Sequence, residues 1–132
     1  MERRILVVDD HDLNVALIER LLELGGHKIR AAGSLAAAER ALAEERPAMV
    51  VLDLNLPDGS GLELTRRLKS HPVTAEIPIL ACTAAVLPAD EHDALEAGCD
   101  AYVSKPIDLR RFQTIVASML AAGSAAWPRA GA

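Results

Sequence analysis

Aromatic residues are nearly absent from this 132-residue sequence, which holds one Trp, one Tyr and one Phe, or 2% of the chain. A surface that stacks nucleic-acid bases needs several aromatic side chains, so base stacking is not expected. Basic residues are also in deficit, because 14 Lys and Arg against 19 Asp and Glu leave a formal net charge of -5. The basic patch typical of proteins that bind nucleic acid or anionic lipid is therefore not expected.

Long hydrophobic runs and paired cysteine motifs are lacking as well. No apolar run approaches the roughly 20 residues that a membrane-spanning helix needs. The run at residues 5–8 is followed at once by Asp9, so it does not read as a signal peptide. The two cysteines, Cys82 and Cys99, form no CxxC motif. We interpret them as buried free thiols in a reducing compartment, which predicts a cytoplasmic protein. The acidic net charge and the short apolar runs together predict that it has no membrane or nucleic-acid partner.

What the chain does have is a regular alternation of two hydrophobic patterns. Short runs rich in β-branched residues predict strands at residues 5–8, 28–31, 49–52, 77–80 and 101–103. Helical spacing follows each run, with Ser34, Pro88, Gly98 and Asp108 as helix-boundary signals. Five β-α units predict an α/β fold with a five-stranded parallel sheet covered on both faces. The doubly wound (βα)5 order 2-1-3-4-5 is the expected one.

Helix faces and the end of the chain can be interpreted in the same way. The first predicted helix has an apolar stripe formed by Leu13, Leu17, Ile18, Leu21, Leu22 and Leu24. We interpret Arg66, Arg67 and Lys69 as part of a solvated face of the third helix.

Residues 1–122 are predicted to form one domain. Residues 123–132 are mostly Ala and Gly and are predicted to be a disordered tail.

Polar side chains follow the predicted strands at the points where they end. Asp9 and Asp10 follow the first strand, Asp53 the third, Thr83 the fourth and Lys105 the fifth. The carboxyl ends of parallel strands meet at one edge, where two carboxylates about 4 Å apart repel by roughly 4 kcal/mol. A cation relieves this repulsion, and hard oxygen ligands favour Mg2+, for which Mn2+ can substitute. Such a site suits a phosphoryl group, with Asp53 as the candidate nucleophile for an acyl phosphate.

Four motifs in this order resemble the receiver domain of two-component response regulators. They are residues 7–10 (VVDD), residues 51–61 (VLDLNLPDGSG), Thr83-Ala84 and Lys105-Pro106. The resemblance covers about residues 3–122, and it implies a flavodoxin-like fold. Residues 98–106 (GCDAYVSKP), together with Asn14, further resemble stand-alone receivers of the cell-cycle type and receivers of hybrid kinases.

The resemblance implies a role for each residue of the site. Asp53 would be the phosphoacceptor and Lys105 would pair with a phosphoryl oxygen. Asp10, Asp53 and the backbone carbonyl of Asn55 would ligate Mg2+, with Asp9 assisting through water. Thr83 would hydrogen-bond the phosphoryl group.

Two further expectations come from the same resemblance. Tyr102 would be the switch aromatic that moves with Thr83, whereas the structural alternative is a half-buried core tyrosine. The peptide bond between Lys105 and Pro106 would be cis, which costs little before proline. Next to the acidic residues, His11 suggests a metal role, but the sequence favours an exposed loop histidine.

As a function, the resemblance implies a phosphorylation-dependent signalling switch and not an enzyme. A histidine kinase or a histidine phosphotransfer protein would dock near the first helix and donate the phosphoryl group. Output would be protein contact through the fourth helix, fifth strand and fifth helix, with no DNA-binding domain. The alternative is a hybrid-kinase receiver that passes the phosphoryl group to a histidine phosphotransfer protein.

Two other classes of function compete with this interpretation. A phosphatase of the haloacid dehalogenase type also uses an aspartate nucleophile and Mg2+. It needs a second carboxylate two residues later, where this chain has Asn55, and a cap for which 132 residues leave no room. A binding module that works without phosphorylation would behave alike with Asp53 or with Asn at that position.

Overall fold

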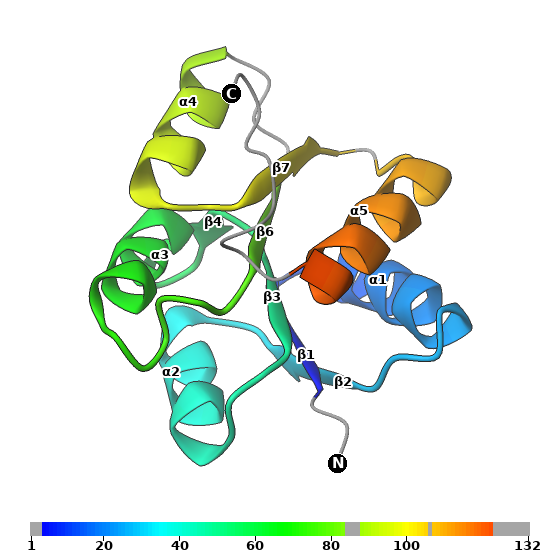
Figure 1. Cartoon of the computed structure of the whole chain (residues 1–132), viewed down its shortest axis with the longest axis horizontal. Coiled ribbons are helices and arrows are strands. Elements are labelled where there is room, and N and C mark those ends of the chain that lie inside the picture. The colour runs from blue at the N-terminus through cyan, green and yellow to red at the C-terminus, as the bar shows by residue number, and fades with distance from the viewer. Residues whose placement is uncertain (1–3, 84–87, 106, 123–132) are drawn as a thin grey trace.

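The computed structural model describes residues 4–83, 88–105 and 107–122. A five-stranded parallel sheet lies between helices on both faces (Figure 1). Its strands are β1 (Ile5–Val8), β2 (Ile29–Ala32), β3 (Met49–Leu52), β6 (Ile79–Thr83) and β7 (Ala101–Ser104). The order β2-β1-β3-β6-β7 confirms the predicted 2-1-3-4-5, and the flavodoxin-like fold with it. An antiparallel pair that the sequence did not predict is formed by β4 (Asn55–Leu56) and β5 (Gly59–Ser60).

Within the part of the chain that the structure describes, five helices cover the sheet. They are α1 (Asp12–Leu24), α2 (Leu35–Glu44), α3 (Gly61–Ser70), α4 (Pro88–Ala97) and α5 (Leu109–Ala122). The predicted boundary signals are confirmed: the Ser34 hydroxyl accepts a hydrogen bond from the N–H of Ala37 at 3.1 Å, and Asp108 accepts one from Arg111 at 2.9 Å. Gly98 follows α4 with a φ of 115°, a conformation that side chains rarely adopt.

Successive residues of each strand point to opposite faces, so two hydrophobic cores form. Leu6 and Val8 belong to the core beneath α2, α3 and α4, whereas Ile5 and Val7 belong to the core beneath α1 and α5 (Figure 1). All four are buried, as expected of a strand covered on both faces. Among the described residues, no helix is long and apolar enough to cross a membrane.

The apolar face predicted for α1 is partly wrong. Leu13, Leu17 and Leu24 are 87%, 40% and 67% exposed. The helix buries Ile18, Leu21 and Leu22 instead. At about 100° per residue, the three exposed leucines lie within some 40° of one another around the helix axis. The buried residues form a separate stripe on the adjoining side of the helix. The sequence places both sets of residues on adjoining faces, and packing against the sheet selects only one.

Two predictions near the amino end of β6 also need correction. The strand begins at Ile79 and not at residue 77, because Pro78 has no N–H to donate to the ladder. The N–H of Ile79 donates instead to the Asp100 carboxylate at 2.8 Å. Lys69 is not solvated, since its side chain is 14% exposed and forms an ion pair of 2.8 Å with Asp100. Helical spacing could not reveal this pair, because its members are 31 residues apart.

Candidate functional site

The site is built on two aspartates that directly follow neighbouring strands. Asp9 comes after β1 and Asp53 after β3, and they are 3% and 4% exposed. Backbone hydrogen bonds that continue the sheet hold both residues in place. The N–H of Asp9 donates to the carbonyl oxygen of Ala32 at 3.0 Å, and the N–H of Asp53 donates to that of Val8 at 2.8 Å. The adjacent strand ends therefore bring two buried carboxylates to the same edge of the sheet, as predicted.

Lys105 reaches both carboxylates from the end of β7. Its Nζ lies 3.0 Å from Asp9 Oδ2 and 3.3 Å from Asp53 Oδ2, and the side chain is 13% exposed. Burial by itself lowers the pKa of this ammonium. The hydrogen bond to Asp9 and the negative charges of Asp53 and Asp9 together outweigh burial, so the pKa is raised. Lys105 therefore stays protonated at neutral pH and offsets part of the negative charge.

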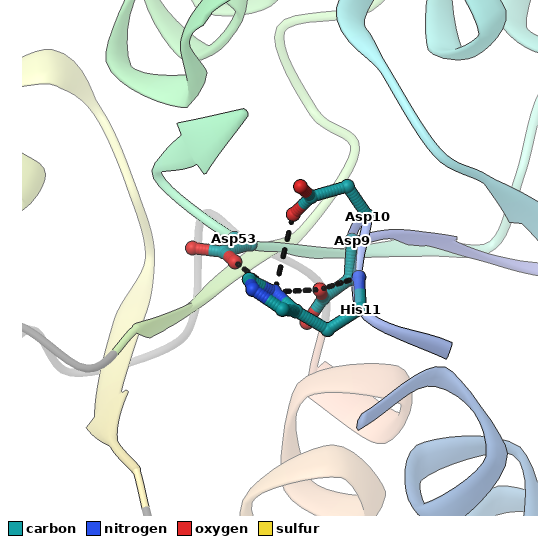
Figure 2. A group of neighbouring side chains, drawn as sticks. All are labelled: Asp9, Asp10, His11 and Asp53. Atoms are coloured by element: carbon teal, nitrogen blue, oxygen red, sulfur yellow. Dashed lines mark hydrogen bonds and ion pairs between the residues drawn. The ribbon is translucent and has the colours of Figure 1, made fainter. Parts of the chain in front are cut away.

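Asp10 and His11 complete the cluster on its solvent side (Figure 2). The His11 Nδ1 lies 3.1 Å from Asp10 Oδ1, 3.2 Å from Asp9 Oδ1 and 4.0 Å from Asp53 Oδ2. The His11 side chain is 63% exposed, which agrees with the predicted loop position. Its ring nevertheless points among the carboxylates, a contact that the sequence prediction missed.

The loop after β3 fixes the orientation of Asp53. The backbone N–H of Asn55 donates to Asp53 Oδ1 at 3.0 Å, so one carboxylate oxygen is held by the loop and the other faces Lys105. At Gly61, the first residue of α3, a Cβ atom would lie 2.6 Å from the backbone oxygen of Asp53. Only glycine permits this approach, so α3 begins directly against the backbone of Asp53.

The same loop is attached to α2 by Asp58. Its two carboxylate oxygens accept hydrogen bonds from the backbone N–H groups of Leu35 and Ala36 at 2.8 and 3.1 Å. Both hydrogen bonds lower the pKa of the Asp58 carboxyl, and the bond from Leu35 has the larger effect. The sequence indicated a turn at residues 57–61, but it held no signal that Asp58 caps a helix which begins 23 residues earlier.

Cys82 lies on β6 just below the charged cluster. It is 1% exposed, and burial raises the pKa of its thiol to about 12, with the charges of Asp9 and Asp53 adding to the effect and that of Lys105 opposing it. Cys99 is buried as well. The prediction of two buried free thiols is therefore confirmed.

Two predicted features of the site extend beyond the described residues. Thr83 ends β6, with its backbone paired to Ser104 of β7, but its side chain lies outside the described residues, as does the Lys105–Pro106 bond predicted to be cis. Tyr102 is half-buried and packs against the core beneath α2, α3 and α4. The switching role of Tyr102 stays a prediction.

The donor set fits a divalent cation. Asp9, Asp10, His11 and Asp53 each offer a ligand atom, and these atoms all lie within 4.8 Å of one another. Carboxylates in small number leave room for water, which suits Mg2+, since this ion keeps several water ligands. The residues present can therefore hold the cation that the sequence predicts.

Comparisons with known proteins agree with this site. Residues 5–117 match the response regulator receiver domain family. The polar-differentiation response regulator DivK of Brucella anthropi is 38% identical over 121 residues, which are 91% of this chain and 98% of the DivK chain. The chain therefore belongs to the receiver domains of two-component signalling, as predicted. DivK agrees with the predicted likeness to stand-alone receivers of the cell-cycle type.

Solved structures show the same architecture. A response regulator from Chloroflexus aurantiacus superposes with a TM-score of 0.87 at 30% identity, covering 92% of this chain and 99% of its own. The receiver domain of the Pseudomonas aeruginosa sensor histidine kinase PA1611 has a TM-score of 0.82, 27% identity and the same two coverages, 92% and 99%. That structure has a magnesium ion coordinated in the active-site cleft. Receivers bind Mg2+ in this acidic site and interact with histidine kinases or phosphotransfer proteins.

Proposed function

We propose that Asp53 is the phosphoacceptor of this receiver. The observation that carries the proposal is the way its carboxylate is held. Asp53 Oδ1 accepts the Asn55 N–H at 3.0 Å, while Oδ2 lies 3.3 Å from the Lys105 ammonium. The carboxylate is thereby oriented at the point where the acidic pair and the lysine meet, which is where a nucleophile for phosphoryl transfer is needed.

The proposed reaction takes the phosphoryl group from a phosphohistidine. A carboxylate oxygen of Asp53 attacks phosphorus and forms an O–P bond while the N–P bond of the donor breaks. The bonding electrons return to the donor imidazole, which can take a proton from water. The Lys105 ammonium neutralises charge on the transferred group, and Thr83 donates its hydroxyl hydrogen to a phosphoryl oxygen.

A divalent cation accompanies this chemistry. Asp10, Asp53 and the backbone carbonyl of Asn55 would hold Mg2+, with Asp9 contributing through water and Mn2+ as a substitute. When bound, the cation offsets negative charge on the phosphoryl oxygens. The carboxylates of Asp9 and Asp53, buried side by side, are the feature of this chain that supports the assignment.

Phosphorylation would shift the protein between two conformers. Thr83 and Tyr102 are the proposed moving residues, and they lie on neighbouring paired strands, since Thr83 pairs with Ser104 and Ala81 with Tyr102. The face built from α4, β7 and α5 would present the change to a downstream protein. The donor, a histidine kinase or a histidine phosphotransfer protein, would dock near α1.

A relay is the second candidate function. The similarity to the receiver of the sensor histidine kinase PA1611 favours it. In this case the phosphoryl group on Asp53 passes on to a histidine phosphotransfer protein. Mixing the phosphorylated chain with such a protein separates the two functions, because relay moves the label from aspartate to histidine whereas a terminal switch only loses it to water.

The remaining assignments follow from the same proposal. Residues 1–122 would form the receiver, whereas residues 123–132, the tail predicted from the sequence, lie outside the described residues. The protein would act in the cytoplasm as a signalling protein, catalysing only its own phosphorylation and dephosphorylation. Asn55 supports this limit, because it stands where a phosphatase of the haloacid dehalogenase type has its acid-base carboxylate.

Intact mass spectrometry with acetyl phosphate tests the phosphoacceptor. The wild-type protein should gain about 80 Da, the mass of one phosphoryl group, with Mg2+ and not with EDTA. Asp53→Asn should gain nothing. Asp108→Asn is the matched control, because it also removes one carboxylate but at the exposed start of α5, and it should be labelled like the wild type.

Two results would contradict the proposal. Stable labelling of Asp53→Asn would place the phosphoacceptor elsewhere. Absence of labelling in the wild type, with both acetyl phosphate and a phosphorylated kinase, would favour a binding module that works without phosphorylation.

A further inference from the structure

His11 is placed unusually for an exposed histidine. It occupies the N-cap position of α1, but its side chain makes no capping hydrogen bond. Its backbone N–H donates to Asp9 Oδ1 at 2.9 Å, which ties the start of the helix to the site. The ring points into the acidic cluster and lies beside Asp9, Asp10 and Asp53 (Figure 2). The imidazole thus contributes to the cluster and not to the helix cap.

The distances around Nδ1 match those between ligands of one metal ion. An octahedral ion with bonds of about 2.1 Å keeps neighbouring ligand atoms about 3.0 Å apart and opposite ones about 4.2 Å apart. Nδ1 lies 3.1 Å from Asp10 Oδ1 and 3.2 Å from Asp9 Oδ1, close to the neighbouring separation. It lies 4.0 Å from Asp53 Oδ2, close to the opposite one. These three distances would allow Nδ1 to share one ion with the carboxylates, although the four groups, whose ligand atoms lie within 4.8 Å of one another, would have to move a few tenths of an ångström closer to all bind it directly.

The chemistry of a nitrogen ligand differs from that of the surrounding carboxylates. Mg2+ takes oxygen ligands, whereas an imidazole nitrogen suits transition-metal ions such as Ni2+ and Zn2+. We propose that His11 Nδ1 is a further metal ligand, which turns the acidic site into a mixed nitrogen–oxygen site and sets its selectivity between transition-metal ions and Mg2+. The inference rests on the proposed metal site. In this role the ring carries its proton on Nε2 and offers the Nδ1 lone pair.

Calorimetric titration of the metal-free chain with Ni2+ and with Mg2+ tests the inference. His11→Asn removes the imidazole and keeps a small polar side chain. The ratio of Ni2+ to Mg2+ affinity should fall about 10- to 100-fold, the scale on which metal sites respond to the loss of a supporting group. His92→Asn is the matched control, since His92 is an exposed histidine that pairs with Glu96 on α4, and its ratio should stay at the wild-type value.

A spectroscopic signature identifies the ligand directly. Pulsed electron paramagnetic resonance of the Mn2+-loaded chain detects hyperfine coupling to a bound imidazole nitrogen. The coupling should be present in the wild type and in His92→Asn and absent in His11→Asn. Its absence from the wild type, its persistence in His11→Asn, or an unchanged affinity ratio would overturn the inference.

One more variant separates this inference from the proposed function. Asp10→Asn should weaken the binding of both ions, because it removes a carboxylate from the shared site. If neither ion binds the wild type, or if Asp10→Asn has no effect, the metal site and the role of His11 fail together. If Mg2+ binding and phosphorylation depend on Asp10 and Asp53 as proposed while the nitrogen signature is missing, only the role of His11 fails.

Discussion

Two buried lysine–aspartate clusters lie at opposite ends of the sheet. Lys105 meets Asp9 and Asp53 at the carboxyl ends of the strands, and Lys69 meets Asp100 at the amino ends of β6 and β7. The lysine side chains are 13% and 14% exposed, and the three aspartate side chains are 2%, 4% and 1% exposed. Similar burial with different surroundings allows a direct comparison of what each cluster does.

The Lys69 cluster is saturated with hydrogen bonds. Its Nζ donates to Asp100 at 2.8 Å and to the backbone carbonyls of Ile77 and Ala75 at 2.7 and 3.1 Å. These three bonds use all three of its protons. Asp100 Oδ2 also accepts the N–H of Ile79. The cluster thus connects the end of α3, the following loop and the starts of two strands into one fixed unit.

The Lys105 cluster has an excess of negative charge instead. One ammonium is shared between Asp9 and Asp53, with Asp10 close by. Repulsion among the carboxylates is only partly offset, so the cluster favours the binding of a further cation. The difference teaches that burial of a charged pair does not reveal its role. The number of unmatched charges and protons distinguishes a structural pair from a reactive one.

The largest expected effect is on the saturated cluster. Lys69→Met keeps the aliphatic packing but leaves the Asp100 carboxylate buried without its cation, which should cost about 3–5 kcal/mol of the free energy of unfolding at neutral pH. Urea denaturation of the wild type and of Lys69→Met measures this loss of stability. Lys28→Met, at an exposed lysine, is the control and should change stability by less than about 0.5 kcal/mol. A loss equally small for Lys69→Met would refute the structural role.

The second expected effect is the loss of stability when the lysine of the reactive cluster is replaced, compared with the loss in Lys69→Met. Lys105→Met should lower stability by roughly 1–3 kcal/mol in EDTA, since the buried carboxylates lose a hydrogen-bond donor and a positive charge. Saturating Mg2+ should reduce this deficit, because the cation supplies charge at the same place. It should leave the Lys69→Met deficit unchanged. Parallel urea titrations with and without Mg2+ measure the two stability deficits. If Mg2+ changes the deficits of Lys105→Met and Lys69→Met to the same extent, the proposed contrast between the clusters is wrong.

The third effect concerns a thiol near each cluster. Cys82 lies below the Lys105 cluster, and Cys99 precedes Asp100, with its sulfur 3.6 Å from the Thr65 hydroxyl. The pKa of Cys82 is raised from 9.0 to about 12, so at pH 8 its thiolate population should be about a thousandfold below that of the unfolded chain. Reaction with a disulfide reagent should be slow in buffer and fast in urea. Rapid labelling of Cys82 in the folded protein would mean that this end of the sheet opens readily.

The sequence predicts the reactive cluster well and the structural one not at all. In a parallel sheet every carboxyl end lies at one edge, so Asp9, Asp53 and Lys105 could be brought together from strand positions alone. Lys69 and Asp100 meet across 31 residues at the amino ends, where no such rule applies. A signal did exist in Gly98, where a Cβ would lie 2.7 Å from Lys69 Cγ, but only the structure gives it a meaning.

Side-chain orientation sets the other limit of prediction. Helical spacing places Leu13 and Ile18 on adjoining faces of α1, and which face is buried depends on how the helix rests on the sheet. For His11 the backbone position next to the acidic pair was evident from the sequence, but the direction of the ring was not. The residues named for the site could be predicted, and the contacts that tune it could not.

The smallest effect tests the loop that adjoins the reactive cluster. The pKa of Asp58 is lowered by its bonds to the α2 backbone, so its stabilising effect is present above the unfolded value of 3.8 and is lost as pH falls through the lower folded value. Asp58→Ala should therefore lower the melting temperature by a few degrees at pH 7 and by much less at a pH below the folded pKa, where the wild-type carboxyl has lost its charge. Thermal unfolding across this range measures the difference, with Asp108→Asn as a capping control that keeps its side-chain acceptor. A deficit that stays constant with pH would mean that the loop is held by packing and not by the charge of Asp58. The attachment of the reactive edge to α2 would then resemble the fixed unit around Lys69 more than the adjustable cluster beside it.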